Sequence, residues 1–240
     1  MLTGVLVEWA VFCSVIGALA SPDPNTGFHE DFNDLDAWQA VTFSKIAKHT
    51  TYQVRAECTD SVLVAKSKRS ASGIVTKNIF DIMEYPIICW RWKISNIYES
   101  GDMRRRSGDD YPMRICIVFA YDPNRAPAGT RLKYELVKAV QGEYPPDSSL
   151  NYVWANQSGE TDMVPSPAVE RTFMIPVESG PSKAGHWLTE TRNVLEDYRR
   201  AFRRDPPRTA SLAIMNDSDN TGEKSVSCVQ FIELRKASSP

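Results

Sequence analysis

Two apolar runs, "PIICWRWKI" (86–94) and "PMRICIVFAY" (112–121), decide the fold class. Each is short, rich in β-branched and aromatic residues, and begins at a proline. Polar turn residues follow both runs, so each predicts a β-strand. Side chains along a strand point alternately to opposite faces of a sheet. Trp90 and Trp92 therefore share one face, whereas Arg91 and Lys93 share the other.

Further runs of the same kind occur along most of the chain, separated by Gly, Pro, Asn, Asp or Ser. Many short strands with turn signals between them are typical of an all-β sandwich or barrel. The runs are "FHEDF" (28–32), "AWQAVTF" (37–43), "TTYQVRA" (50–56), "SVLVAKS" (61–67), "SGIVTKNI" (72–79), "LNYVWA" (150–155), "RTFMIPV" (171–177), "ASLAIM" (210–215) and "SVSCVQFIEL" (225–234).

Two segments instead show the apolar spacing of a helix. In "RLKYELVKAVQ" (131–141) an apolar stripe could pack on the sandwich. The segment from 187 to 203 carries apolar residues on one face, and Asp205-Pro206-Pro207 ends it. We therefore expect an amphipathic helix near 187–203. The apolar positions of the two segments are Leu132, Leu136, Val137 and Val140, and Trp187, Val194, Leu195, Tyr198 and Phe202.

Length and composition favour one globular domain. The 240 residues are 42% hydrophobic and 24% charged, with no internal repeat and no low-complexity linker. A formal net charge of -2 gives no electrostatic case for a nucleic-acid partner. The basic clusters "MRRR" (103–106) and "RRAFRR" (199–204) have acidic neighbours and are read as solvated faces.

The first twenty residues differ in character from the rest. "WAVFCSVIGALA" (9–20) ends in a small-x-small pattern before the polar stretch "SPDPN", which predicts a signal peptide over 1–20. The predicted mature domain is 21–240, and we expect it to be secreted. The segment lacks Lys and Arg and contains Glu8, so an uncleaved anchor or a misplaced start is the alternative. The run is short for a membrane span, and no later segment could cross a bilayer.

Removing Cys13 with the signal peptide leaves four cysteines, which could form two disulfides by three connectivities. Export to an oxidising compartment would permit them. Alternatively, the cysteines inside apolar runs are buried free thiols that pack as small hydrophobes. A Cys/His zinc site is not expected, because there is no CxxC pair and there are only three histidines. The four are Cys58, Cys89, Cys116 and Cys228.

Five phrases in a fixed order carry a family resemblance. They are "YPIICWRWKISN" (85–96), "GDDYPMRICIVFAYDP" (108–123), "GEYPP" with "LNYVWAN" (142–156), "RNVLEDYRRAFRRDPP" (192–207) and "AIMNDSDNTGE" (213–223). Over about 28–234 the chain resembles the bacterial domain-of-unknown-function family DUF3047. The resemblance implies an exported or periplasmic protein with a jelly-roll-like β-sandwich and no established catalytic residues. With the helical segments added, the expected fold is an all-β sandwich with one or two short docked helices.

The last of these phrases contains half of a calcium loop. Asp217-x-Asp219-x-Thr221-Gly222 alternates oxygen side chains and ends in the glycine that allows a sharp turn. The second half of the calcium-loop motif is absent, because Cys228 occupies the position where the motif has a bidentate Glu. Calcium bound by Asp217 and Asp219 would need ligands from elsewhere, for example from "GDDYP". The alternative is that these side chains bond their own backbone at a loop.

Charged residues inside strands must be paired or must line a groove. Buried ion pairs are one interpretation, and a groove that binds a saccharide or similar cell-envelope polymer is the other. Aromatic residues in strands could stack on sugars, but they could equally form the core. The candidate ligand-binding residues are Arg91, Asp109, Asp110, Tyr111, Arg114, Asn151, Trp154 and Arg192.

Three functions remain open at this point. The first is a non-catalytic envelope binding protein for a saccharide or similar polar polymer. The second is a polysaccharide-active hydrolase or lyase that uses acidic residues of "GDDY" and "NDSDN", or Tyr111 and Arg114 with Lys93. The third is a structural envelope component. No G-x-S-x-G motif is present, and "GPSKAG" (180–185) lacks a P-loop ending, so nucleotide binding is not expected.

Overall fold

The computed structural model describes residues 27–57, 60–124, 126–141 and 144–237. The expected signal peptide (1–20) and Cys58 lie outside the described residues. The signal peptide and a disulfide bond of Cys58 therefore stay predictions. Among the described residues, no helix is long and apolar enough to cross a membrane.

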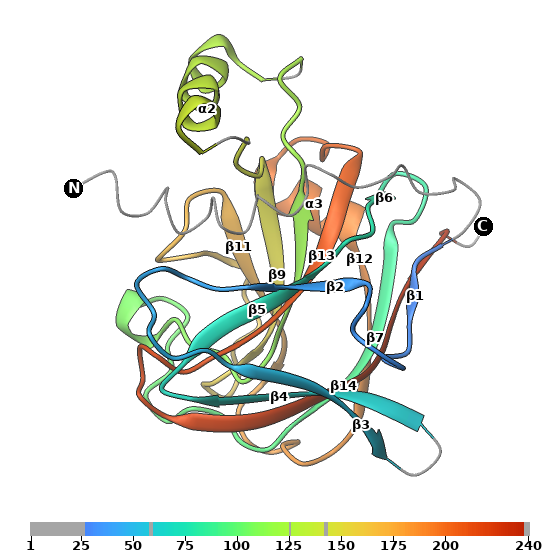
Figure 1. Cartoon of the computed structure of the whole chain (residues 1–240), viewed down its shortest axis with the longest axis vertical. Helices are drawn as coiled ribbons and strands as arrows, with labels where there is room; N and C mark the ends of the chain where they lie inside the picture. Colours follow the sequence, from blue (N-terminus) through green and yellow to red (C-terminus); the bar gives the residue numbers. More distant parts are fainter. Residues whose placement is uncertain (1–26, 58–59, 125, 142–143, 238–240) are drawn as a thin grey trace.

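Two sheets form the body of the molecule (Figure 1). The six-stranded sheet has the order β12-β7-β14-β4-β3, with β1 also paired to β14. Its strands are β1 (His29–Glu30), β3 (Thr51–Glu57), β4 (Asp60–Lys68), β7 (Ile87–Ile94), β12 (Leu188–Asn193) and β14 (Lys224–Arg235).

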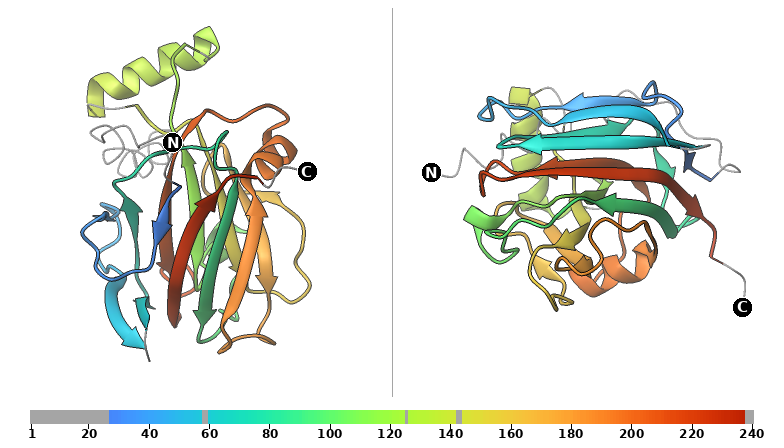
Figure 2. Two further views of the ribbon diagram at one scale, coloured as in Figure 1. Left: turned by 90° about the vertical axis from the view of Figure 1, so that its right-hand side faces the viewer. Right: turned by 90° about the horizontal axis from the view of Figure 1, so that it is seen from below.

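The eight-stranded sheet has the order β10-β11-β9-β8-β13-β5-β2, with β6 also paired to β13. Its β9–β11 pair is parallel. The strands are β2 (Trp38–Val41), β5 (Ala71–Thr76), β6 (Phe80–Asp81), β8 (Arg114–Phe119), β9 (Ser148–Ala155), β10 (Val164–Pro165), β11 (Thr172–Ser179) and β13 (Thr209–Asp217). The layers lie face to face (Figure 2), which confirms the predicted β-sandwich.

The core lies between the sheets and is rich in aromatic side chains. Trp90 and Trp92 of β7 are fully buried, and so is Trp154 of β9. The rings of Trp92 and Trp154 lie 5.7 Å apart, in the range where aromatic pairs stabilise a core. The Trp154 indole nitrogen donates a hydrogen bond to the Gly180 carbonyl at 3.0 Å. These tryptophans therefore hold the two sheets together.

One helix is shorter than its sequence predicts. Leu188–Asn193 form strand β12, which pairs antiparallel with β7, and α3 covers only Val194–Phe202. The expectation of a helix over 187–203 is therefore wrong for its first part. The polar, β-branched alternation there suits an edge strand. Asn193 then starts the helix, because its side chain accepts hydrogen bonds from the backbone nitrogens of Leu195 and Glu196.

The other helix, α2 (Ala128–Gln141), lies beyond one end of the sandwich (Figures 1 and 2). Leu132 on this helix is 66% exposed. Tyr134 is buried and donates a hydrogen bond to the Pro146 carbonyl at 3.1 Å. The predicted helix is thus present, and Tyr134 ties it to the segment that leads into β9. A short 3-10 turn, η1 (Arg106–Gly108), precedes β8.

The eight-stranded sheet is covered on both faces. On β8, Ile115 and Ile117 face the core, whereas Cys116 and Val118 face outward into a small apolar cluster. A second outward cluster contains Val153 of β9. Buried outward positions mean that loops pack over this face, and the functional candidates lie there.

The three cysteines among the described residues are free thiols and form no disulfide. Cys89, Cys116 and Cys228 are free, and the first two are buried. Burial raises the pKa of the Cys116 thiol to about 12, as expected for a small hydrophobic side chain in an apolar cluster.

Replacing Trp154 should unfold the protein far more easily. Because its ring is fully buried between the sheets, Trp154→Ala should reduce the free energy of unfolding by about 3–5 kcal/mol. Guanidinium chloride denaturation would measure this. Trp187→Ala is the matched control, since Trp187 is half-buried outside the core and should cost much less. Equal losses in the two variants would contradict the placement of Trp154.

Candidate functional site

A buried ion pair joins β8 to the end of β13. The Nε atom of Arg114 donates to Asp217 Oδ1 at 3.1 Å, and Nη2 donates to Asp217 Oδ2. The side chains of Arg114 and Asp217 are only 9% and 2% exposed. Two parallel bonds between guanidinium and carboxylate are the strongest geometry for such a pair. The expectation that a strand-embedded arginine is paired holds for Arg114.

The same aspartate also orders the segment before β8. Asp217 Oδ1 accepts a hydrogen bond from the backbone nitrogen of Tyr111 at 3.1 Å. Arg114 Nη2 donates to the backbone carbonyl of Asp109 at 3.1 Å. The "GDDYP" and "NDSDN" phrases, about a hundred residues apart in sequence, therefore lie against each other.

A second contact from "GDDYP" shapes the loop after β13. Asp110 Oδ2 accepts from the backbone nitrogen of Thr221 at 2.6 Å and from its hydroxyl at 2.8 Å. Asp110 Oδ1 accepts from the Asn220 amide at 3.2 Å. Gly222 follows with a φ of 75°, a left-handed conformation that suits glycine. Asp110 thus fixes the turn that a calcium ion would otherwise organise.

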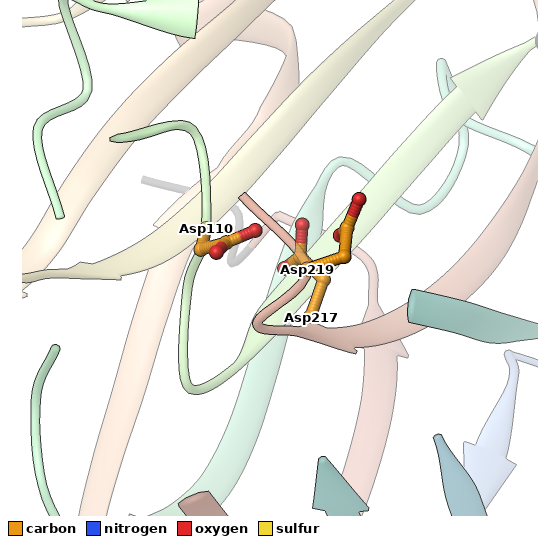
Figure 3. Close-up of side chains that lie close together, drawn as sticks. All are labelled: Asp110, Asp217 and Asp219. Atoms are coloured by element: carbon orange, nitrogen blue, oxygen red, sulfur yellow. The ribbon is translucent and has the colours of Figure 1, made fainter. Parts of the chain in front are cut away.

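Three carboxylates gather at this turn. One oxygen each of Asp110, Asp217 and Asp219 lies within 4.8 Å of the others (Figure 3). However, both oxygens of Asp110 and both of Asp217 already accept hydrogen bonds from protein groups. Calcium takes six to eight oxygen ligands, and these protein donors compete for the same oxygens. The geometry favours the loop-capping interpretation of the phrase.

Asp109 differs from its neighbours because its carboxyl is incompletely paired. The residue is 5% exposed, and its Oδ1 atom has no hydrogen-bond partner among the described residues. Arg114 Nη1 lies 4.0 Å from that oxygen, which is too far for a hydrogen bond. The pKa of Asp109 is raised to about 6, mainly because burial disfavours the charged form. Arg114 and the Tyr111 hydroxyl oppose the rise. The charges of Asp110 and Asp219 add to it.

A pocket of about 140 Å³ opens beside these groups on the outer face of the eight-stranded sheet. Arg114, Cys116 and Val118 of β8 and Asn151 of β9 line it from the sheet. Strand register places Cys116 directly opposite Asn151. Loop residues add apolar surface from Phe43, Ile46, Ala168 and Val169, and carboxylates from Asp109 and Asp219. Asp217, the last residue of β13, adds a third carboxylate.

The structure brings some predicted residues together at this pocket. Asp109, Arg114, Asn151, Asp217 and Asp219 all line it. Asp110 lies next to them in the loop contact described above, and Tyr111 is fully buried with the Arg114 guanidinium 4.7 Å from its ring centroid.

Other predicted residues lie elsewhere. Arg91 is on the six-stranded sheet, where its guanidinium lies 5.6 Å from the Trp187 ring centroid. Arg192 pairs with Asp197 at the start of α3. Trp154 belongs to the core, so its ring is not available to a ligand.

The lyase arrangement that the sequence left open as an alternative is not formed. Lys93 lies on the six-stranded sheet and pairs with Glu57 at 3.0 Å, whereas Tyr111 and Arg114 lie at the pocket. The acidic residues of "GDDY" and "NDSDN" do come together, as the hydrolase alternative requires.

Sequence reasoning missed several lining residues. Phe43 and Ile46 come from the loop after β2, and Ala168 and Val169 from the loop before β11. Nothing in a loop sequence shows which sheet face it covers. Cys116 and Val118 could have been found, since strand alternation places them on the face of Arg114.

A family model agrees with the sequence phrases. The family described as "Protein of unknown function (DUF3047)" matches residues 36–233. The chain belongs to this family. This match confirms the resemblance that the five phrases indicate, and DUF3047 as described has no assigned function. No match was found among curated proteins.

Solved structures share the sandwich at low identity. A family 11 carbohydrate-binding module from Clostridium thermocellum, in complex with a mixed-linked tetrasaccharide, is 12% identical with a TM-score of 0.42, covering 88% of this chain and 97% of that one. Endoglucanase 3 of Trichoderma harzianum is 6% identical with a TM-score of 0.38, covering 90% and 100%. The K1 adhesin domain of Lys-gingipain from Porphyromonas gingivalis is 7% identical with a TM-score of 0.39, covering 89% and 99%. Likeness at this level carries no argument about the ligand of this DUF3047 protein.

Removing the charge of Asp109 should stabilise the protein at neutral pH. Its carboxyl has a pKa of about 6 when folded against an ordinary 3.8, so the folded state loses stability as pH rises through this range. Asp109→Asn avoids that loss, so above pH 7 its free energy of unfolding should exceed that of the wild type by on the order of 2–3 kcal/mol. Urea denaturation of both proteins at several pH values measures the gain.

The pH dependence supplies the control for this prediction. Below the ordinary pKa the wild-type carboxyl is neutral in both states, so the two proteins should have equal stability there. A variant that is less stable than the wild type at neutral pH would show that Asp109 is fully paired.

Calcium should not stabilise the protein. Because protein donors already occupy the oxygens of Asp110 and Asp217, we expect the same melting temperature in excess calcium and in EDTA. Differential scanning fluorimetry measures both. A rise with calcium that disappears in Asp219→Asn would instead establish a cation site at the "NDSDN" loop.

Proposed function

We propose that this DUF3047 protein is an exported, non-catalytic binding protein, and that the pocket beside Asp109 takes one unit of a saccharide or similar polar polymer of the cell envelope. The observation that carries the proposal is the convergence of Asp109, Arg114 and Asn151 with the "NDSDN" loop at a pocket whose remaining walls are apolar apart from Ser149 and Ser166.

The pocket chemistry suits a sugar ring. Small-molecule sites combine apolar walls with a few convergent polar groups. A pyranose presents C–H faces, which would pack against Phe43, Ile46 and Val169, and hydroxyl groups, which would meet polar atoms at one end. The volume of about 140 Å³ favours a single ring over a longer segment.

Asn151 provides an available polar group in this pocket. Its amide nitrogen donates to the Met174 sulfur at 3.4 Å, and a thioether is a weak acceptor. Exchange of that contact for a ligand hydroxyl would therefore strengthen the hydrogen bonding of Asn151. Asp109 Oδ1, which lacks a partner among the described residues, offers a strong acceptor nearby.

One observation supports an enzyme as the second candidate. A carboxyl with a raised pKa near a second carboxyl is the arrangement that acid-assisted glycoside hydrolysis uses. Asp109 has a pKa of about 6, and Asp219 is close enough to raise it. In this alternative Asp109 is the acid and Asp219 the second carboxylate. A structural envelope component, the third candidate, requires no pocket.

Glycan binding and turnover measured together separate these functions. We expect the wild type to bind members of a glycan array without releasing reducing or unsaturated ends. Asn151→Ala should weaken binding about tenfold by removing a hydrogen bond and wall contact. Asp205→Asn is the control, because Asp205 is an exposed partner of Arg199.

Each remaining outcome has a defined meaning. Turnover that is lost in Asp109→Asn would replace the binding function with the enzymatic one. The absence of both binding and turnover would overturn both and leave the structural candidate.

A further inference from the structure

We propose that the unit bound in this pocket carries a protonated amino group, which the Asp109 carboxylate holds. This inference rests on the proposed binding function and names the chemical class of its ligand, an amino sugar or another organic ammonium with a ring or alkyl body.

The charge around the pocket is unbalanced. Its buried charged lining residues are the carboxylates Asp109 and Asp217 against the guanidinium of Arg114. Asp110 adds a further buried carboxylate next to them. An excess of buried negative charge is costly in a low-dielectric site unless a cation balances it. The pocket therefore favours a positively charged ligand over a neutral or negative one.

Arg114 does not reverse this preference. Its Nε and Nη2 atoms are bound to Asp217, and Nη2 also reaches the Asp109 carbonyl. The remaining Nη1 atom lies 4.0 Å from Asp109 Oδ1, so an anionic ligand group that approached Nη1 would meet the Asp109 carboxylate. A uronate or phosphate would also meet the surrounding aspartates at close range, so the pocket should reject both.

Asp109 is the group with unused binding capacity. Its Oδ1 atom lacks a hydrogen-bond partner among the described residues, although the residue is only 5% exposed. An ammonium group carries three donors and a full charge. A charge-assisted hydrogen bond from it would satisfy this oxygen and reduce the repulsion from Asp219.

An inorganic cation fits the pocket less well than an organic one. Divalent ions require several oxygen ligands, and the oxygens of Asp110 and Asp217 are already bonded to protein donors. The pocket wall also carries oxygen side chains on Ser149, Asn151 and Ser166, but Phe43, Ile46, Val118 and Val169 are apolar. They instead suit the carbon body of an organic ammonium.

Calorimetry with matched oligosaccharides tests the inference. Glucosamine oligomers, their N-acetylated counterparts, neutral glucose oligomers and uronate oligomers of one length would be titrated into the full chain. The pH would lie between the pKa of Asp109 and that of the sugar amine. We expect glucosamine oligomers to bind at least about tenfold more tightly than the N-acetylated ones, as one charge-assisted bond allows.

Asp109→Asn should abolish the preference, leaving the amine and its N-acetylated counterpart with similar affinities. Asp205→Asn should keep the wild-type preference. Equal affinity of the wild type for charged and neutral sugars would overturn the ammonium inference while the saccharide function stands. Tightest binding of the uronate oligomer would also overturn it.

Spermidine and calcium complete the experiment. If no oligosaccharide binds but spermidine binds in an Asp109-dependent manner, the saccharide function fails and the ammonium site stands. If neither binds, both fail. Calcium that binds at the pocket in place of every organic cation would overturn the ammonium inference.

Discussion

The buried pair of Arg114 and Asp217 is the interaction on which the outer face of the eight-stranded sheet depends. Two buried charges are tolerated only with close pairing and hydrogen bonds to the remaining donors and acceptors. The pairing is close, and the Tyr111 nitrogen and the Asp109 carbonyl add hydrogen bonds to Asp217 and to Arg114. Loss of either partner would leave an uncompensated charge under the loops, at a cost of about 3–5 kcal/mol. The loop contacts of Asp110 and the position of Asp109 follow from this pairing.

Strand periodicity predicted the sandwich, but it could not distinguish which charged strand residues face a pocket. Arg91 and Arg114 have nearly the same local pattern, each following an apolar residue and preceding another. The difference is tertiary. Loops around Phe43 and Val169 cover the face of Arg114, whereas Arg91 lies beside Trp187 on the other sheet. Strand β12 was missed for a related reason, because its pairing with β7 outweighed the helical spacing of the apolar residues Trp187 and Val194 on either side of it.

The phrase "NDSDN" shows that a local pattern can correctly predict a sharp turn and still suggest a ligand, calcium, that the turn does not need. Asp217, Asp219 and Gly222 have the spacing of half a calcium loop because the chain makes a similar sharp turn. The missing half comes from Asp110, which binds Thr221 directly. A contact across about a hundred residues cannot be read from spacing. The proximity of "GDDYP" was nevertheless a sound expectation, since buried carboxylates and a strand arginine needed partners.

Asp109 differs from the neighbouring charged residues because one of its buried carboxylate oxygens has no hydrogen-bond partner among the described residues. A sequence specifies its fold most consistently when every buried polar group is satisfied, and departures concentrate at functional sites. Asp110 and Asp217 have hydrogen bonds to both of their carboxylate oxygens, and Arg114 is paired with Asp217, so these three residues stabilise the fold. Asp109 has a buried oxygen without a hydrogen bond and a pKa raised to about 6, so it lowers stability at neutral pH. A residue that costs stability beside a pocket is better explained by what enters the pocket than by the fold. That distinction separates the positioning aspartates from the one that a ligand would meet.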